Sequence, residues 1–228
     1  MDGNGRWAHR RGMPRSFGHK QGAEAVRRVM KAAAESGVKY LTLFGFSSEN
    51  WARPKEEIQE LMYLLRHYLL SETVELHKNN ARLRVIGDRA AFDSDIIQLI
   101  ENAEQLTQNN DSIQVIIALN YGGRHDIAQA AYKIAEQALA TGKVQDIKSI
   151  EHSFGGFLMT AGIPDPDLLI RTSGEKRISN FLLWQCAYAE MIFTPVLWPD
   201  FDKKEFALAL EEYAARDRRF GALKQQEA

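Results

Sequence analysis

The chain contains little cysteine, almost no net charge and no long apolar run. Cys186 is the one cysteine among 228 residues, so an internal disulfide and a multi-cysteine zinc site are both excluded. The net charge of −1 argues against a general nucleic-acid-binding domain, which is normally basic. No apolar run approaches the roughly 20 residues needed to cross a bilayer, and no charged-then-apolar secretory leader is recognisable. These absences indicate a cytoplasmic protein.

The composition is ordinary for a globular protein, with 45% hydrophobic and 26% charged residues. A chain of this length can bury a sizeable core. The apolar neighbours of Cys186 indicate a buried, unreactive thiol rather than a catalytic one. Neither an internal repeat nor a low-complexity linker interrupts the chain, so we predict a single domain over residues 1–228.

Helix-like and strand-like segments alternate along the chain. Apolar residues recur at helical spacing in some segments, while others are short, apolar and rich in β-formers. Helices are predicted over residues 23–36, 56–77, 93–108, 124–139, 180–188 and 203–216, and strands over residues 38–46, 82–86, 112–121, 167–172 and 191–197. This alternation predicts an α/β fold with a mainly parallel central sheet flanked by helices. Binding loops should then gather at the carboxyl ends of the strands.

The first seven residues combine a carboxylate, two glycines, an asparagine and an arginine. Glycine lets backbone amides approach an oxyanion, arginine offers a bidentate fork for phosphate, and Asp2 suits a hard divalent cation. A surface turn explains Asp-Gly-Asn-Gly alone nearly as well. The nearby aromatic and cationic residues favour a site for a metal-bridged diphosphate: Trp7, Arg10, Arg11, Arg15 and His19.

A second group of cations follows the predicted strand 167–172. Arg171, Arg177 and Ser179 suit another diphosphate, although salt bridges to Glu175 or Asp167 are the alternative explanation. Two anion-binding clusters that share one metal-competent acid imply two phosphorylated substrates.

Five blocks of the sequence, in one order, resemble the cis-prenyltransferases of the undecaprenyl diphosphate synthase family. They are residues 2–7 (DGNGRW), 46–54 (FSSENWARP), 120–124 (NYGGR), 167–175 (DLLIRTSGE) and 177–185 (RISNFLLWQ). The Asp-Asp-x-x-Asp pattern of trans-prenyltransferases is absent, which favours the cis class.

The resemblance implies a Mg²⁺-dependent transferase that adds isopentenyl diphosphate units to farnesyl diphosphate with cis double-bond formation. The expected product is undecaprenyl diphosphate, the carrier lipid for bacterial peptidoglycan synthesis. Asp2 and Glu190 are the implied metal ligands. The implied residues for the primer diphosphate are Gly3, Asn4, Gly5, Arg6, Trp7, Arg15 and His19, and those for isopentenyl diphosphate are Arg171, Arg177, Ile178 and Ser179.

Residues 47–53 form a polar segment after an apolar strand. In the family this segment covers the substrate, which implies binding roles for Ser47, Ser48, Glu49, Trp51 and Arg53 and catalytic roles for Ser47 and Asn50 beside Asp2. No histidine or free carboxylate in this block is a clear proton acceptor. We therefore expect Asn50 and Ser47 to orient a proton relay, with the diphosphate or Asp2 as the acceptor, and Glu57 to help close the cover.

A long prenyl product requires an apolar tunnel between sheet and helices. The candidates share apolar character and element spacing, and core packing explains them equally well: Phe44, Phe46, Leu61, Met62, Leu65, Leu69, Leu83, Val85, Ile113, Val115, Ile117 and Leu119.

The resemblance also implies a homodimer, formed through residues 178–184 and 191–198 and the terminal Arg219-Phe220-Gly221. Contact with the inner face of the plasma membrane is expected through the lipid product only. Relatives usually carry a leader and an apolar strand before Asp2, so either the start is trimmed or the numbering begins within the natural protein. A non-catalytic partner subunit of the same fold and a metal-dependent phosphohydrolase are the competing functions.

Overall fold

Five short strands, each parallel to its partners, form the centre of the fold. In this computed structural model, which describes residues 1–216, β3 (Ile113–Tyr121) lies between β1 (Tyr40–Ser47) and β2 (Ala81–Ile86). β4 (Leu168–Arg171) pairs with β5 (Glu190–Phe193) in a second sheet. The predicted α/β class with a parallel sheet is confirmed, and the pairing divides it into a three-stranded and a two-stranded part.

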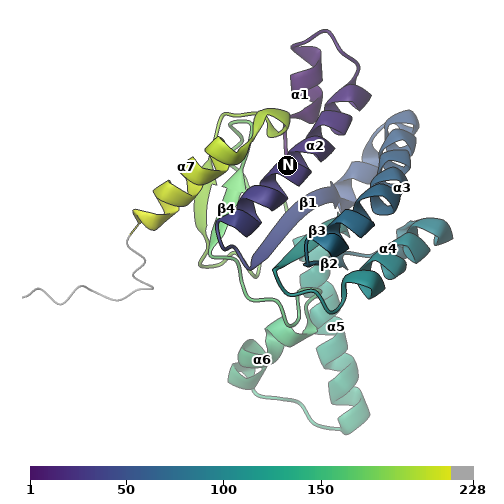
Figure 1. The fold of residues 1–228 in the computed structure, drawn as a ribbon. Helices are drawn as coiled ribbons and strands as arrows, with labels where there is room; N and C mark the ends of the chain where they lie inside the picture. The colour runs from purple at the N-terminus through teal and green to yellow at the C-terminus, as the bar shows by residue number, and fades with distance from the viewer. Residues whose placement is uncertain (217–228) are drawn as a thin grey trace, which may run out of the picture.

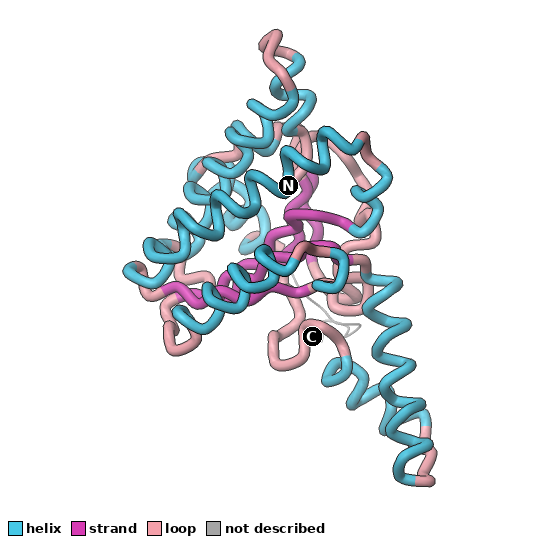
Figure 2. The backbone as a smooth tube through the Cα atoms, turned by 90° about the vertical axis from the view of Figure 1, so that its right-hand side faces the viewer, coloured by secondary structure: helices cyan, strands magenta, loops and turns pink. Residues whose placement is uncertain are grey.

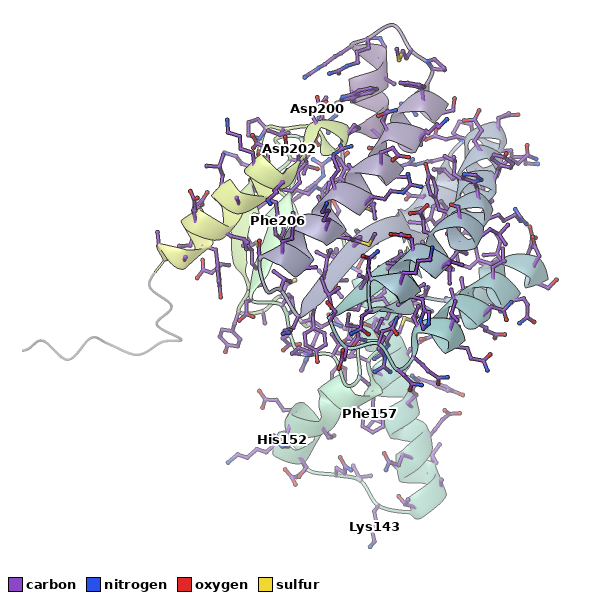
Figure 3. The ribbon with its side chains drawn as sticks, viewed as in Figure 1. Lys143, His152, Phe157, Asp200, Asp202 and Phe206 are labelled. Carbon is purple, nitrogen blue, oxygen red and sulfur yellow. The ribbon has the colours of Figure 1, made fainter. Side chains whose placement is uncertain are left out.

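Helices surround these strands, and the α5–α6 pair projects away from them (Figures 1 and 2). Lys143 marks the tip of that projection (Figure 3). The α-helices are α1 (Asn4–His9), α2 (Arg15–Glu35), α3 (Lys55–Lys78), α4 (Ser94–Thr107), α5 (Gly123–Thr141), α6 (Ile147–Ser153) and α7 (Lys203–Ala214), and the short 3-10 helices are η1 (Ser48–Ala52), η2 (Arg89–Ala91), η3 (Phe154–Phe157) and η4 (Trp198–Asp200). None of the helices within residues 1–216 is long and apolar enough to cross a bilayer.

The predicted helix over residues 180–188 is wrong, because this segment forms successive turns. Ser179, Asn180 and Leu182 have φ values of 50°, 59° and 43°, a left-handed conformation that interrupts an α-helix. Its apolar spacing arises because Leu182 and Cys186 are both buried against the sheet. Cys186 is buried, as predicted, and burial raises the pKa of its thiol to about 11.

Two helix starts also differ from the prediction. α2 begins at Arg15 directly after Pro14, eight residues before the predicted helix. Glycines in this part of α2 kept the sequence from predicting it as a helix. Glycine is required at position 18, because a Cβ atom on Gly18 would lie 2.1 Å from the Asn4 carbonyl oxygen. Asn4 belongs to the unpredicted helix α1, which packs on α2.

The central strand β3 is buried on both faces, as its apolar sequence predicts. Val115 packs with α2, α7 and η4 in one cluster, and Leu119 packs with α3 and α4 in a second. Ile116 and Ala118 point to the opposite face, where they pack with residues that follow α6 and β4. The central strand therefore anchors three apolar clusters.

A cavity of about 370 Å³ lies between β1 and β4 and is lined mainly by apolar side chains. Within residues 1–216, Phe44 is the one tunnel candidate that lines this cavity. Other residues of β1, such as Leu43, line it as well. Many of the other candidates are packed core, including Met62, Leu69 and Val85. The product tunnel accordingly stays a prediction.

The free edge of β2 is covered by side chains from α4 and the turn after it. An unpaired edge strand exposes backbone donors and acceptors, which must find other partners when buried. Thr107 Oγ1 accepts a hydrogen bond from Leu83 N at 3.0 Å, Glu104 Oε1 accepts one from Val85 N at 2.7 Å, and Asn110 Nδ2 donates one to Ala81 O at 2.8 Å. These contacts end the three-stranded sheet at β2.

Thr107→Val should destabilise the protein by about 1–3 kcal/mol, because the buried Leu83 amide loses its acceptor. Thr141→Val is the matched control: both hydroxyls donate to the carbonyl four residues earlier, but Thr141 is exposed. Urea unfolding followed by circular dichroism measures the difference. Equal destabilisation by the two substitutions would show that the edge contact contributes nothing.

Candidate active site

Asp2 is clamped between the end of β4 and η4. Its backbone N–H donates to Thr172 Oγ1 at 3.0 Å, and its carbonyl oxygen accepts from Thr172 Oγ1 at 2.9 Å and from Trp198 N at 2.9 Å. Gly3 follows with a φ of 104° and is the N-cap of α1. A Cβ atom on Gly3 would lie 2.8 Å from Leu197 Cδ2, so glycine is required for this close approach. The clamp brings the N-terminal block to the carboxyl end of β4, as the sequence predicts.

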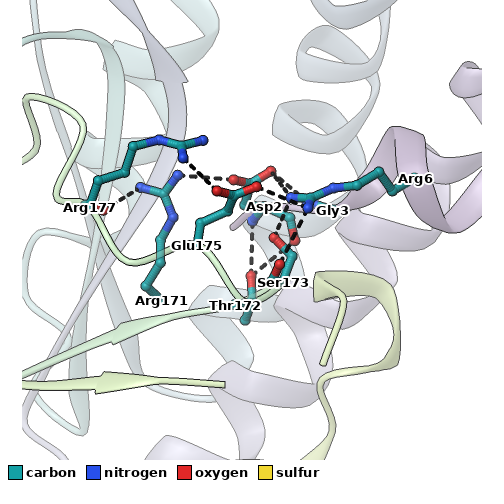
Figure 4. Close-up of polar contacts among 8 residues, drawn as sticks. All are labelled: Asp2, Gly3, Arg6, Arg171, Thr172, Ser173, Glu175 and Arg177. Carbon is teal, nitrogen blue, oxygen red and sulfur yellow. Dashed lines mark hydrogen bonds and ion pairs between the residues drawn. The ribbon is translucent and has the colours of Figure 1, made fainter. Parts of the chain in front are cut away.

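Five charged side chains form one connected group around Asp2, which we call the Asp2 ring: Asp2, Arg6, Arg171, Glu175 and Arg177 (Figure 4). Asp2 Oδ2 is 2.9 Å from Arg171 Nη2, and Asp2 Oδ1 is 3.4 Å from Arg6 Nη2. Glu175 then links Arg6, at 2.9 Å, to Arg177, and Arg171 Nη1 donates to Arg177 O at 3.0 Å. Three cations therefore face two carboxylates.

The Asp2 ring combines what the sequence presents as two separate clusters. Arg177 does form a salt bridge with Glu175, as the alternative explanation expected, but Arg171 pairs with Asp2. Glu175 contacts an arginine from each cluster, so the salt bridge joins the clusters instead of excluding an anion site. Ser173, which also lies here, accepts a hydrogen bond from Arg6 Nη2 at 2.7 Å.

The Asp2 carboxylate is held in its ionised form. Partial burial raises its pKa, but the hydrogen bond and charge of Arg171 lower it more, with further contributions from the Gly3 amide and Arg6. The net result is a pKa below the usual range of an aspartate. A divalent cation requires this ionised form.

A second group of charges lies around Glu57 at the start of α3. Glu57 accepts from Arg15 Nη1 at 3.0 Å and from Arg53 Nη1 at 2.8 Å, and its Oε1 is 3.5 Å from His19 Nε2. Burial lowers the pKa of His19, as do the charges of Arg53 and Arg15, whereas Glu57 opposes the shift. Glu57 thus connects α2 to the segment that ends at Arg53. This is the position required of a residue that helps residues 47–53 to cover the substrate.

Three polar atoms in this region are buried without a hydrogen-bond partner. They are Asn4 Oδ1, Arg171 Nε and His19 Nε2, the last of which has only the long 3.5 Å contact with Glu57; in residues 1–216 the same condition is met elsewhere only by Gln185 Oε1. Buried polar groups are normally paired, so a concentration of unpaired ones indicates a place where a ligand supplies the partner. The amides of the first turn of α1 lie in the same region and have no acceptor within the helix.

Residues 47–53 form η1 and its flanking residues. Ser47 Oγ accepts from Glu49 N at 3.2 Å, and Asn50 Oδ1 accepts from Ser47 N at 3.0 Å, so the two side chains predicted to act in catalysis shape this turn. Trp51 donates to Asn120 Oδ1 at 2.9 Å and packs against the ring of Phe46. Trp51 therefore packs against the strand that precedes this segment.

Glu190 lies away from Asp2. It begins β5 opposite Leu168, while Asp2 contacts Arg171 at the other end of β4, about 10 Å further along a strand. The Glu190 carboxylate instead accepts from Arg216 Nη1 at 2.7 Å. Within one chain, the separation of Glu190 from Asp2 therefore does not support its predicted role as a metal ligand. The segment Arg219-Phe220-Gly221, predicted to take part in the dimer, lies outside the described residues.

Ile178 and Ser179 continue from Arg177 along the edge of the site. Ile178 packs against the cluster beneath β4, and Ser179 adopts a left-handed conformation. Sequence reasoning missed Asn120 and Asn180, each of which binds η1 through its side chain. The available signal was their residue type and position: both are asparagines, which tolerate a left-handed backbone, and they lie within the blocks NYGGR and RISNFLLWQ.

The donor set around Asp2 fits a magnesium ion bound jointly with phosphate. No three acidic, histidine or cysteine side chains of residues 1–216 cluster as a metal site by themselves. Mg²⁺ commonly uses one or two carboxylates and completes its shell with phosphate oxygens and water. Asp2 offers an ionised, partly exposed carboxylate next to three arginines, which is compatible with a metal–diphosphate complex.

Comparison with known proteins places this arrangement in a family. Residues 1–221 match the family model described as putative undecaprenyl diphosphate synthase. An isoprenyl transferase of Agrobacterium fabrum is 52% identical, covering 100% of this chain and 92% of the relative. A ditrans,polycis-undecaprenyl-diphosphate synthase ((2E,6E)-farnesyl-diphosphate specific) of Coxiella burnetii is 51% identical, covering 99% of this chain and 95% of the relative.

A solved structure agrees in fold. Lavandulyl diphosphate synthase from Lavandula x intermedia, in complex with dimethylallyl diphosphate, is 37% identical with a TM-score of 0.92, and the match covers 97% of this chain and 95% of that one. The protein therefore belongs to the undecaprenyl diphosphate synthase family of cis-prenyltransferases.

Proposed function

We propose that this protein condenses isopentenyl diphosphate with farnesyl diphosphate in a Mg²⁺-dependent reaction that forms cis double bonds and yields undecaprenyl diphosphate. The Asp2 ring carries this proposal, because it places one ionised carboxylate among three arginines at the end of a parallel strand. The name of the Coxiella burnetii relative supports farnesyl diphosphate as the primer.

Two groups of cations would hold the two diphosphates. The primer diphosphate is assigned to Arg6, Arg15, His19 and the first-turn amides of α1, beside Trp7, and isopentenyl diphosphate to Arg171, Arg177 and Ser179. Glu175 and Glu57 currently neutralise these cations, so a bound diphosphate would compete with carboxylates for the same guanidinium groups. Binding of each diphosphate would then replace a glutamate carboxylate at these arginines with a phosphate group.

The reaction breaks the C1–O bond of the primer, and the alkene of isopentenyl diphosphate forms the new C–C bond. Arginines placed at the departing diphosphate stabilise its charge as the bond breaks. Mg²⁺, when bound with Asp2, would supply further charge stabilisation to phosphate oxygens. Loss of one proton completes the product, and we assign Ser47 and Asn50 to the orientation of its path, with the diphosphate or Asp2 as acceptor.

We further propose that the enzyme is a homodimer. Trp184 and Phe193, in the segments predicted to pair, are large apolar side chains that are each 37% exposed. Sedimentation equilibrium should give twice the mass of one chain. Contact with the membrane is proposed through the lipid product alone.

Asp2→Ala should reduce turnover at least about 100-fold, because both the metal-competent carboxylate and the partner of Arg171 are lost. Incorporation of labelled isopentenyl diphosphate onto farnesyl diphosphate, at several Mg²⁺ concentrations, measures the effect. Asp95→Ala is the control, since Asp95 also pairs with an arginine but does so between α3 and α4. Near-normal Mg²⁺-dependent turnover in Asp2→Ala would contradict the assignment, provided that circular dichroism shows a native fold.

Arg177→Ala should raise the KM for isopentenyl diphosphate by about 10-fold or more while changing the KM for farnesyl diphosphate much less. Arg66→Ala, which removes a guanidinium paired with Asp93 and Asp95, is the control. Steady-state kinetics with each substrate varied in turn separates the two constants. Equal changes in both KM values would argue against two distinct diphosphate positions.

Chromatography of the extracted lipid reports the product length. A phosphohydrolase would instead release phosphate from either substrate alone.

A further inference from the structure

Asn180 lies where three segments of the site meet. Its side-chain Nδ2 donates to Glu49 Oε1 at 2.7 Å, and its Oδ1 accepts from Arg124 N at 2.8 Å. Its backbone carbonyl oxygen accepts from Gly123 N at 2.7 Å. One residue thus connects η1, the start of α5 and the segment that carries Arg177 and Ser179.

The orientation of the Asn180 amide is determined by its partners. A backbone N–H can only donate, so the oxygen of the amide must face Arg124 N. The nitrogen then faces Glu49, an ionised carboxylate that can only accept. Burial raises the pKa of Glu49, but hydrogen bonds from Ser47 and Asn180 lower it more. The contact between Asn180 and Glu49 is therefore a charge-assisted hydrogen bond across two segments.

The junction is closely packed around Gly122. A Cβ atom on Gly122 would lie 2.7 Å from Ser48 Oγ and 2.8 Å from Asn180 Nδ2. Asn180 has a φ of 59° and directly follows Ser179, with a φ of 50°. Residues other than glycine occupy this conformation at an energetic cost, and such residues persist where surrounding contacts hold them. Here the three hydrogen bonds of Asn180 hold the chain reversal directly after Arg177.

We propose that Asn180 is a positioning residue that couples the order of residues 47–53 to that of residues 177–180. Asn180 binds Glu49 of the predicted cover and lies three residues after Arg177 of the Asp2 ring. When Asn180 holds Glu49, the chain reversal at Ser179 and Asn180 is held as well. Closure over the substrate and placement of the isopentenyl diphosphate arginines are thereby linked, an assignment that rests on the proposed function.

Asn180→Gly tests the side chain without the backbone, because glycine accepts the left-handed conformation and removes both side-chain hydrogen bonds. Asn80→Gly is the matched control. Asn80 has a φ of 54°, donates through Nδ2 to Asp111 Oδ1 at 2.7 Å and accepts from Asp111 N, at a turn between α3 and β2. Hydrogen–deuterium exchange of the full chain, without substrate, should rise about 10-fold at residues 47–53 in Asn180→Gly and stay unchanged there in Asn80→Gly.

The coupling must also act in the reverse direction, since linkage between two segments is reciprocal. Glu49→Ala should raise exchange at residues 177–181. In kinetics, Asn180→Gly should raise the KM for isopentenyl diphosphate about 10-fold, with a smaller change for farnesyl diphosphate.

A rescue variant distinguishes coupling from simple loss of stability. Asn180→Asp places a carboxylate oxygen against Glu49 and should increase exchange at residues 47–53 more than Asn180→Gly does. Adding Glu49→Gln to Asn180→Asp restores a donor–acceptor pair and should return exchange toward the wild-type rate. Unchanged exchange in Asn180→Gly, an equal rise in Asn80→Gly or failure of the rescue would overturn the inference. If exchange behaves as expected but the wild-type protein shows no prenyl transfer, the coupling stands and the proposed function fails.

Discussion

The ion pair between Asp2 and Arg171 is the contact on which the site depends. It joins residues that are 169 positions apart, and it forms because Thr172 and Trp198 clamp the backbone of Asp2 at the end of β4. The Arg171 side chain is 15% exposed and that of Asp2 35%, so neither charge is fully hydrated. Removing either partner would leave a half-buried charge unpaired, which costs more than the pair itself contributes. Backbone contacts thus place the charges, and the charges then define the site.

Carboxylates hold the remaining cations of the site in the absence of substrate. Glu175 pairs with Arg6 and Arg177, and Glu57 pairs with Arg15 and Arg53. Close guanidinium groups would repel one another without an anion between them. Because a diphosphate carries more charge than a carboxylate, it can displace these glutamates while keeping the arginines together. Under the proposed function, the same arginines form these salt bridges in the free protein and bind the diphosphates when substrate is present.

Periodicity predicted most of the fold, and residue chemistry singled out Asp2, Arg6, Arg171 and Arg177, which the structure brings into one group. The strands and the helices α3, α4, α5 and α7 follow apolar repeats that need no knowledge of tertiary contacts. The segment 180–188 was misjudged because Leu182 and Cys186 satisfy a helical spacing while left-handed backbone angles, set by contacts with Glu49 and Gly123, prevent the helix. The separation of Glu190 from Asp2 likewise depends on strand register, which the residue types do not specify.

Left-handed residues concentrate where the chain turns at the site. Asn120 lies in the last two residues of β3, Ser173 follows β4, and Ser179 and Asn180 follow Arg177. Each turn directs a backbone or side-chain group to a neighbouring segment: Asn120 to Trp51, Ser173 to Arg6 and Asn180 to Glu49. These turns are unfavourable locally and are held only by contacts between segments. A site built this way loses its geometry when one such contact is lost, because the backbone itself then favours another conformation.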